Sequence, residues 1–260
     1  MSQRQDVDMS LLDEIATDWK DNSYYDRAEL SDWLVPFWGA DSPFRKLFSQ
    51  LDITSLVELA CGHGRHSAQV IAETEFPTPS QMFLLDVNVE NVDFCKNRFS
   101  SAPFVKVVKN NGYNFSPLQD SSVSAIFCYD AMVHFEYDCV ISYIKDALRV
   151  LKGGGRGLFH HSNYVNSPGT KYIYNPHGRN FMSRELFSHI AQRVGFHVVD
   201  QVVLDWGTDG NPGDYRVANL DCLSLLEKPQ TLSTTGDAIS KRSAAWMLRG
   251  LWTKLNCLLK

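Results

Sequence analysis

Glycines and one carboxylate stand at the ends of consecutive apolar segments, in a spacing that suits nucleotide chemistry. The apolar run Leu56–Ala60 leads into a turn that contains Gly62 and Gly64, and a helical pattern follows it. Glycine lets the backbone turn tightly and approach a ligand without a Cβ in the way. The next apolar run ends in Asp86, whose carboxylate can accept hydrogen bonds from both hydroxyls of a ribose. A strand, a glycine turn and a helix form the geometry of a nucleotide-type site at the carboxyl edge of an α/β sheet.

The residue types alone leave the identity of the nucleotide open. The string GHGRHS departs from the dinucleotide fingerprint at its last position, where Ser67 replaces a glycine. A dinucleotide is therefore one alternative. An adenosyl compound that carries a positive charge and no pyrophosphate is the other, because a carboxylate-lined crevice suits such a ligand.

A longer series of motifs bears on this choice. The string ELACGHGRHS, followed by LLDVN and later by LKGGGRGLFHHS, resembles the signature series of the class I S-adenosylmethionine-dependent methyltransferases over about residues 50–226. The resemblance implies that the glycine turn lies against the methionine part of the cofactor and that Asp86 binds the ribose. Glu58, in this reading, holds the ammonium group or fixes the glycine loop through backbone amides. Ala60 stands where the family most often has glycine.

The same resemblance implies further cofactor contacts. Asn111 and Gly112 follow the third predicted strand, where the family places a side chain near the adenine. Tyr129 ends the fourth strand at the mouth of the pocket, and Tyr25 belongs to a segment that closes over the cofactor. The expected site for S-adenosyl-L-methionine, and for its product S-adenosyl-L-homocysteine, is therefore Tyr25, Glu58, Ala60, Gly62, Gly64, Asp86, Val87, Asn111, Gly112 and Tyr129.

Histidines at strand ends are the candidate bases. A hydroxyl acceptor gains from a group that takes its proton, and histidine suits this role near neutral pH. His160 and His161 point to opposite faces of one strand, and we assign the base to His161, with His134 second. The expected reaction is methylation of a hydroxyl oxygen on a sugar or secondary metabolite. The alternatives are N-methylation of a small amine or protein side chain, a non-catalytic adenosyl-binding module, and an NAD-linked oxidoreductase.

Residues 163–182 are too long and too aromatic for a routine connection, which favours a substrate loop. Its stacking and hydrogen-bonding side chains are Tyr164, Tyr172, His177 and Arg179. At residues 129–132 the sequence YDAM replaces the Asn/Asp-Pro-Pro-aromatic sequence that is typical of methyltransferases acting on nucleobase amines. Methylation of nucleic acid is therefore disfavoured.

Strands that alternate with helices predict the scaffold that must position these residues. We expect a Rossmann-like, doubly wound α/β fold with a mostly parallel seven-stranded sheet and helices on both faces. The expected strands are 56–60, 81–87, 104–108, 123–129, 156–161, 196–204 and 220–227. Residues 1–50 are expected to form a helical, aromatic lid segment, 51–227 the methyltransferase domain, and 228–260 a linker and a C-terminal amphipathic helix.

Composition narrows the class of partner. Of the 260 residues 44% are hydrophobic, and Lys+Arg 25 against Asp+Glu 30 gives a net charge of −5, so no basic field predicts a nucleic-acid partner. The six cysteines show no metal-ligand spacing, so no metal is expected, and reduced thiols indicate a cytoplasmic protein. The C-terminal helix is expected to pack on its own domain or on a second subunit in a homodimer, with weak contact to an anionic membrane surface as the alternative.

Overall fold

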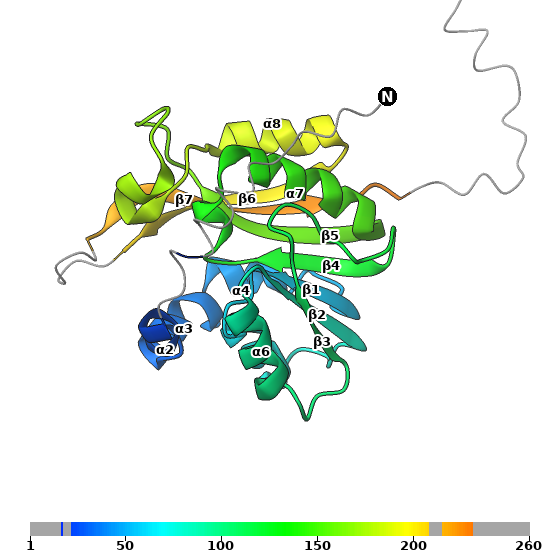
Figure 1. Ribbon diagram of the computed structural model, residues 1–260. Coiled ribbons are helices and arrows are strands. Elements are labelled where there is room, and N and C mark those ends of the chain that lie inside the picture. The colour runs from blue at the N-terminus through cyan, green and yellow to red at the C-terminus, as the bar shows by residue number, and fades with distance from the viewer. Residues whose placement is uncertain (1–16, 18–21, 208–214, 231–260) are drawn as a thin grey trace, which may run out of the picture. The chain divides into compact units, whose positions relative to one another are not determined.

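The computed structural model describes residue 17, residues 22–207 and residues 215–230 (Figure 1). Most of the first 21 residues of the expected lid segment, and the expected C-terminal amphipathic helix, lie outside the described residues. The helices are α2 (Asn22–Ala28), α3 (Ser31–Trp38), α4 (Pro43–Phe48), α5 (Arg65–Ala72), α6 (Val89–Arg98), α7 (Tyr137–Val150) and α8 (Arg184–Val194). The strands are β1 (Ser55–Leu59), β2 (Gln81–Asp86), β3 (Val105–Lys109), β4 (Val123–Cys128), β5 (Leu151–Ser162), β6 (His197–Trp206) and β7 (Val217–Glu227).

The seven strands form one sheet in the order β3-β2-β1-β4-β5-β7-β6. The first five pair in parallel, whereas β7 runs antiparallel to both β5 and β6. Every residue of β1 and of β4 is buried, as is typical of parallel strands covered on both faces. The predicted Rossmann-like fold with a mostly parallel seven-stranded sheet is therefore confirmed.

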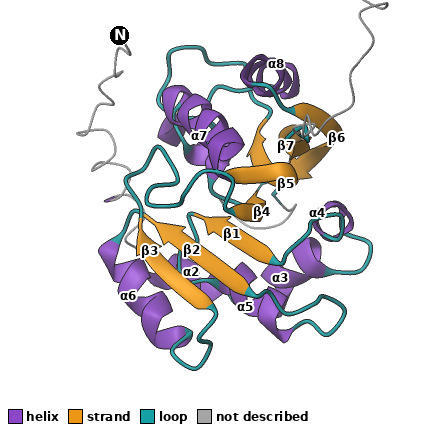
Figure 2. Cartoon of the chain, turned by 90° about the vertical axis from the view of Figure 1, so that its right-hand side faces the viewer, coloured by secondary structure: helices purple, strands orange, loops and turns teal. Residues whose placement is uncertain are grey.

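Helices cover both faces of this sheet, as Figure 2 shows. On one face α7 and α8 pack their apolar sides on the strands, with Tyr143 and Phe187 in that core. On the other face the core holds Phe44 and Phe48 of α4 together with Val70 of α5. Because the first five strands are parallel, their carboxyl ends meet at one edge, and the loops after β1, β2 and β4 converge there.

The triple glycine Gly153–Gly155 lies within a strand and not at the end of a helix. The helix α7 ends at Val150, and the glycines lie inside β5. Val123 pairs with Leu151 but Ala125 pairs with Arg156, so the glycine segment bulges out of the ladder. Glycine suits such a bulge because Gly154 adopts a positive φ of 78°.

Residues 163–182 form two single-turn 3₁₀ segments, η2 (Tyr172–Tyr174) and η3 (Pro176–Gly178), with a bridge between Tyr164 and Phe181. A third such turn, η1 (Met132–His134), follows β4. Within the described residues, no helix has the length and hydrophobicity that crossing a membrane requires.

Candidate active site

The loop between β1 and α5 follows a path that glycine makes accessible. Gly62 and Gly64 have φ values of 54° and 75°. A Cβ on Gly62 would lie 2.6 Å from Cε1 of Tyr25, and one on Gly64 would lie 2.6 Å from the ring of Phe99. Ala60 also has a positive φ, 55°, a backbone conformation that glycine adopts at lower cost. The turn therefore brings bare backbone against the side chains that cover it.

Asp86 ties this loop to the next strand. Its Oδ2 accepts a hydrogen bond from the Gly62 amide at 2.8 Å. Its Oδ1 accepts from the Asn88 amide at 2.8 Å and from Nδ2 of Asn91 at 3.1 Å. Burial raises the pKa of Asp86, and these donors act in the opposite direction. The carboxylate thus holds the glycine loop at the edge of a cavity that it also lines.

Glu58 contacts the first turn of α5, next to the glycine loop, and does not lie in the cavity. Its Oε2 accepts hydrogen bonds from the backbone amide of Ser67, at 3.2 Å, and from the Ser67 hydroxyl. It is 2% exposed and does not line the cavity, and burial raises its pKa to about 8. Of the two roles expected for Glu58, the structure shows the second in a modified form, a bond to the first turn of α5.

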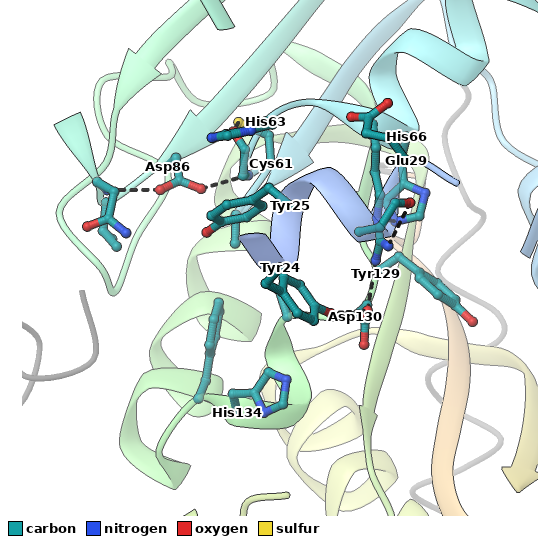
Figure 3. A pocket seen from close by; sticks show the side chains of 18 residues that line it. Tyr24, Tyr25, Glu29, Cys61, His63, His66, Asp86, Tyr129, Asp130 and His134 are labelled. Atoms are coloured by element: carbon teal, nitrogen blue, oxygen red, sulfur yellow. Dashed lines mark hydrogen bonds and ion pairs between the residues drawn. The ribbon is translucent and has the colours of Figure 1, made fainter. Parts of the chain in front are cut away.

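The far end of the cavity is built by the residues that follow β4 (Figure 3). Asp130 has a left-handed backbone with φ 54° and forms an ion pair with Arg65 at 2.7 Å. It also accepts a hydrogen bond from the hydroxyl of Tyr24 at 3.0 Å. Burial would raise the pKa of Asp130, but the charges of Arg65 and Arg179 hold it below its usual value. A strained non-glycine residue next to a cavity is a common mark of a functional site.

Tyr25 of α2 covers the glycine loop. Its ring stacks on that of His63, with centroids 4.3 Å apart, and His63 stacks in turn on Phe94 at 3.8 Å. Nδ2 of Asn91 donates to the Tyr25 hydroxyl at 3.1 Å. In Figure 3, Tyr24 and Tyr25 lie between Asp86 at one end and His134 at the other.

The cavity beneath these tyrosines is small, about 100 Å³. A second cavity of about 40 Å³ adjoins it and shares Ala60, Asp86 and Val87 with it. Ligand pockets usually enclose about 300–1,000 Å³. The space enclosed by these side chains is therefore smaller than an adenosyl compound needs, and Tyr24 and Tyr25 of α2 are among the side chains that cover it.

His134 lines the larger cavity and is held in one tautomer. Its Nδ1 lies 2.7 Å from the carbonyl oxygen of Gly178, and because a carbonyl only accepts, Nδ1 donates. The lone pair of the neutral ring then belongs to Nε2. Burial, together with the charge of Arg179, lowers the pKa of His134 to about 4.

His161 does not reach this cavity, so its assignment as the base is wrong. Its ring stacks on Phe187 of α8 at 3.8 Å. Nδ1 bonds the carbonyl oxygen of Ser162 and Nε2 bonds the hydroxyl of Ser224, both at 2.8 Å. Burial lowers the pKa of His161 to about 3. The alternation of β5 turns this side chain toward α8.

His160 points the other way and supports the cavity wall. Its Nδ1 accepts a hydrogen bond from the backbone amide of Asp130 at 3.1 Å, and its ring stacks on Tyr129. Nε2 lies 3.1 Å from Oδ2 of Asp221. The strand alternation predicted that only one of the two histidines could face the site, but not which one.

The asparagine that lines the smaller cavity is Asn110, one residue before the Asn111 that was expected near the adenine. Asn110 and Gly112 line the smaller cavity, whereas Asn111 does not. The Asn111 amide is used in a local turn, where its Oδ1 accepts from the backbone amides of Tyr113 and Asn114 at 3.1 Å. The hydroxyl of Tyr143 donates to Asn110, which fixes that side chain in the cavity wall.

The four residues expected to bind the acceptor are engaged in other contacts and line neither cavity. Arg179 is 2% exposed and forms a two-pronged ion pair with Asp221, with distances of 2.9 and 2.6 Å. His177 bonds the carbonyl oxygen of Tyr215 at 2.6 Å, and Tyr164 bonds the hydroxyl of Ser167 at 2.9 Å. Tyr172 is buried beside His134. The loop of residues 163–182 therefore packs around the site without lining either cavity.

The structure therefore brings Tyr25, Ala60, Gly62, Asp86, Val87, Tyr129 and His134 to one cavity. It adds Tyr24, Arg65 and Asp130, which the sequence reading missed. Asp130 directly follows Tyr129, so its place at the end of β4 was the available signal. Arg65 lies in the glycine motif itself, at the first position of α5.

Carboxylates form part of the wall of this cavity. They come from Asp86, Asp130 and Glu29. Asp130 is paired with Arg65 and Glu29 with Arg98, whereas Asp86 accepts hydrogen bonds from the neutral groups of Gly62, Asn88 and Asn91. Among the described residues, no group of three or more histidine, cysteine or acidic side chains could hold a metal ion.

Comparisons with known proteins agree with this geometry. Residues 56–155 match the family model described as a methyltransferase domain. No curated protein matches the sequence significantly. Among solved structures, a SAM-dependent methyltransferase from Aquifex aeolicus is similar with a TM-score of 0.55 and 15% identity, covering 80% of this chain and 98% of that one.

Two further structures share the fold but differ in chemistry. Geranyl diphosphate C-methyltransferase from Streptomyces coelicolor A3(2), in complex with S-adenosyl-L-homocysteine, has a TM-score of 0.55 and 15% identity, covering 71% of this chain and 76% of that one. The cyclase SpnF has a TM-score of 0.56 and 14% identity, covering 72% and 80%. At such identities the likeness to solved structures shows the fold alone. Residues 56–155 carry a methyltransferase domain, and the chain is an enzyme that uses S-adenosylmethionine as its cofactor.

Proposed function

We propose that the enzyme methylates a hydroxyl oxygen of a small molecule and that His134 receives the hydroxyl proton. The observation that carries this proposal is the placement of His134 in the same cavity as Gly62 and Asp86, with Nδ1 committed to the Gly178 carbonyl. S-adenosylmethionine, when bound, supplies a sulfonium whose methyl carbon is open to in-line attack. Alignment of the acceptor with that carbon and removal of its proton are the two tasks left to the protein.

We assign the cofactor residues from the two adjoining cavities. Ala60 and Gly62 would face the methionine part, and Asn110 and Gly112 of the smaller cavity would face the adenine. Asp86 lines both cavities, which suits a carboxylate that binds the ribose between them. Tyr25 and Tyr129 would close over the methionine part, and Gly64 would shape the turn.

The low pKa of His134 keeps the ring neutral, and it also makes the ring a weaker base than an ordinary histidine. A histidine whose pKa is about 4 is neutral throughout the physiological range and can accept a proton at Nε2. The imidazolium that forms is a stronger acid than usual, so it passes the proton readily to water. His134 therefore orients the hydroxyl through its lone pair and returns to the neutral form after each turnover.

The test compares acceptors that differ only in the attacking atom. The full-length enzyme is incubated with S-adenosylmethionine and pairs of alcohols and amines that share one carbon skeleton, and methylated products are identified by mass spectrometry. We expect the alcohols to be methylated. His134→Ala should lower kcat about 10²–10⁴-fold, the usual loss for a general base. Its affinity for S-adenosylhomocysteine, measured by calorimetry, should stay within about threefold of the unchanged enzyme.

Methylation of a small amine is the second candidate, and Asp130 favours it. The Asp130 carboxylate is kept ionised by Arg65 and Arg179 and could hold an ammonium group in the cavity. Methylation of the amine member of each pair, with the alcohol untouched, would replace our proposal by this one. Tight binding of S-adenosylhomocysteine without any methylated acceptor would favour a non-catalytic module instead.

A further inference from the structure

Two cysteine thiols meet beside the glycine loop. Cys61 lies in the turn after β1 and Cys95 lies in α6, yet their Sγ atoms are 4.0 Å apart although 34 positions separate the residues in the sequence. Among the cysteines of the described part of the chain, these two form the only pair of thiols in contact. Two thiols at this distance can be joined by oxidation, so the pair is a candidate modification site.

Both sulfur atoms also contact the backbone of the glycine loop. The Sγ atom of Cys95 lies 3.2 Å from the carbonyl oxygen of Gly62, and that of Cys61 lies 3.7 Å from the same oxygen. Because a carbonyl only accepts, the thiols donate to it. The amide of Gly62 donates to Asp86 on its other side, at 2.8 Å. The thiol pair therefore takes part in holding the turn on which the cofactor site is built.

The two thiols differ in their access to the cavity. Cys61 lines the cavity of the candidate active site and is 5% exposed (Figure 3). Cys95 is completely buried and does not line the cavity. A small oxidant that enters the cavity therefore reaches Cys61 first, and Cys95 is placed to react with the oxidised sulfur. An adenosyl compound bound in the cavity would cover Cys61 and keep the oxidant out.

A bond between the sulfur atoms would change the shape of the turn. The S–S bond of a disulfide is about 2.05 Å long, so the two atoms must approach each other by about 2 Å. A disulfide carries no proton, so the carbonyl of Gly62 would lose both thiol donors. The turn has little free space, since a Cβ on Gly64 would lie 3.2 Å from the sulfur of Cys95. Movement of Cys61 toward α6 must therefore be accommodated by the glycine loop itself.

We propose that Cys61 and Cys95 form a reversible disulfide when the cofactor site is empty and that this disulfide weakens cofactor binding. The oxidant is hydrogen peroxide or an alkyl hydroperoxide. The thiolate of Cys61 attacks a peroxide oxygen, the O–O bond breaks, and Cys61 becomes a sulfenic acid while the remaining oxygen takes up a proton and leaves as water or an alcohol. The sulfur of Cys95 then attacks the sulfur of Cys61. The S–O bond breaks, and its oxygen leaves as water with the proton of Cys95. The two thiols lose two electrons, which the peroxide gains.

The surroundings of Cys61 make this oxidation slow. The hydrogen bond with Cys95 and burial raise the pKa of the Cys61 thiol well above its usual value, and the charges of Asp86 and Glu58 act in the same direction. Because only the thiolate attacks a peroxide, the site responds to lasting exposure and not to a brief one. The coupling to the cofactor is reciprocal: a disulfide that weakens cofactor binding tenfold is disfavoured tenfold by bound cofactor. This holds for any methyl acceptor.

The test follows the thiol pair and the cofactor affinity in the same sample. The full-length enzyme, free of cofactor, is exposed to hydrogen peroxide, free thiols are alkylated, and linked peptides are identified by mass spectrometry. We expect a link between Cys61 and Cys95. The affinity for S-adenosylhomocysteine, measured by calorimetry, should fall at least about tenfold and return on reduction with dithiothreitol. Excess S-adenosylhomocysteine during exposure should lower the amount of link at least about fivefold. Absence of the link would overturn the proposal, and so would a link that leaves the affinity unchanged.

A variant separates the disulfide from oxidation of Cys61 alone. Cys95→Ser keeps a donor for the Gly62 carbonyl, so before exposure it should bind S-adenosylhomocysteine within about threefold of the unchanged enzyme. Peroxide should then no longer weaken its binding. Cys222→Ser is the matched control, because Cys222 is equally buried but its sulfur contacts the hydroxyl of Ser224, and this variant should stay as sensitive as the unchanged enzyme.

Two results with these variants would contradict the proposal. Loss of affinity in peroxide-treated Cys95→Ser would mean that a disulfide is not the cause. Protection of the enzyme by Cys222→Ser would mean that another thiol is responsible. Should Cys95→Ser fail to fold, the peptide mapping and the affinity of the unchanged enzyme still decide the question.

Discussion

The Asp86 carboxylate has a structural role in the glycine loop and a proposed role in binding the ribose. A carboxylate has about four lone-pair positions, and the Gly62 amide, the Asn88 amide and the Asn91 side chain use three of them. In the proposed assignment, the position that remains accepts a hydrogen bond from one ribose hydroxyl, while the three observed bonds hold the glycine loop in place.

The glycine at position 62 gives a direct prediction. Gly62→Ala should weaken binding of S-adenosylhomocysteine by about tenfold or more, because the new Cβ would press on the Tyr25 ring from a strained, positive-φ backbone. Gly169→Ala is the matched control: its φ is 78°, yet nothing lies within 4 Å of the added Cβ. Calorimetry on both variants checks this, and equal affinities in the two would show that Tyr25 does not restrict the loop.

The pH dependence of catalysis follows from His134. With a pKa of about 4, His134 keeps its lone pair down to that pH, so kcat/KM should stay level from about pH 8 to pH 5 and fall only near pH 4. An ordinary histidine base would instead reduce the rate below about pH 6.5. A steady-state profile on the identified acceptor distinguishes these cases. An inflection near pH 6.5 that His134→Ala abolishes would contradict the lowered pKa.

At the residue scale, the sequence predicted backbone roles better than side-chain directions. Gly62 and Asp86 were identifiable because a strand, a turn and a second strand fix their spacing. The choice of Asn111 over Asn110, and of His161 over His160, depended on which face of the backbone meets a helix. That information is absent from the strand pattern, since Phe187, which covers His161, lies 26 residues further along the chain.

At the scale of elements, the junction between β1 and α5 depends on a buried carboxyl group. Glu58, at the fourth position of β1, bonds both the amide and the hydroxyl of Ser67 in the first turn of α5. A pKa of about 8 means that Glu58 is protonated in the folded state at neutral pH. The unfolded chain, in contrast, loses this proton near pH 4.5.

This difference makes stability fall as pH rises. Because the folded-state pKa is the higher one, the contribution of Glu58 is complete below about pH 4.5 and is lost as the pH approaches 8. Glu58→Gln keeps an acceptor for Ser67 and does not titrate. We therefore expect the variant to gain roughly 2–4 kcal/mol relative to the unchanged protein between pH 5 and pH 8. Urea unfolding at the two pH values measures this gain, and a constant difference would refute it.

The elements themselves were largely predictable, because apolar runs and helical periods are local properties. The N-cap of α8 is an example of such a local signal: the Ser183 hydroxyl accepts from the Leu186 amide at 3.0 Å, and serine is a preferred residue at this position. The glycine bulge in β5 was not predictable, because three glycines after a helix resemble a helix stop until the pairing of β4 with β5 is known.

At the scale of the whole molecule, a buried network of polar and charged side chains joins the sheet to the loop of residues 163–182. Asp221 of β7 contacts His160 of β5 and Arg179 of the 163–182 loop, and all three side chains are almost completely buried. Burial would raise the pKa of Asp221, but the hydrogen bond from the His160 ring and the charge and hydrogen bonds of Arg179 hold it well below its usual value. Its stabilising effect is therefore present above about pH 4 and is lost in acid.

Removing this one charge should affect the entire fold. Asp221→Asn leaves the Arg179 guanidinium buried without its counterion and should lower the free energy of unfolding by about 3–5 kcal/mol at pH 7. Glu185→Gln, which breaks the exposed pair with Arg184, should change it by less than about 1 kcal/mol. Urea denaturation of both variants provides the comparison. Equal losses would mean that the network contributes no more than a surface ion pair.

Tyr25 lies on the glycine loop and is bonded to α6, over a space too small for an adenosyl compound. We therefore expect exchange of the spent cofactor for a fresh one to involve displacement of Tyr25 and α2. Lids of this kind often limit product release, so substitutions in α2 should change the overall rate at a position that does not contact the acceptor.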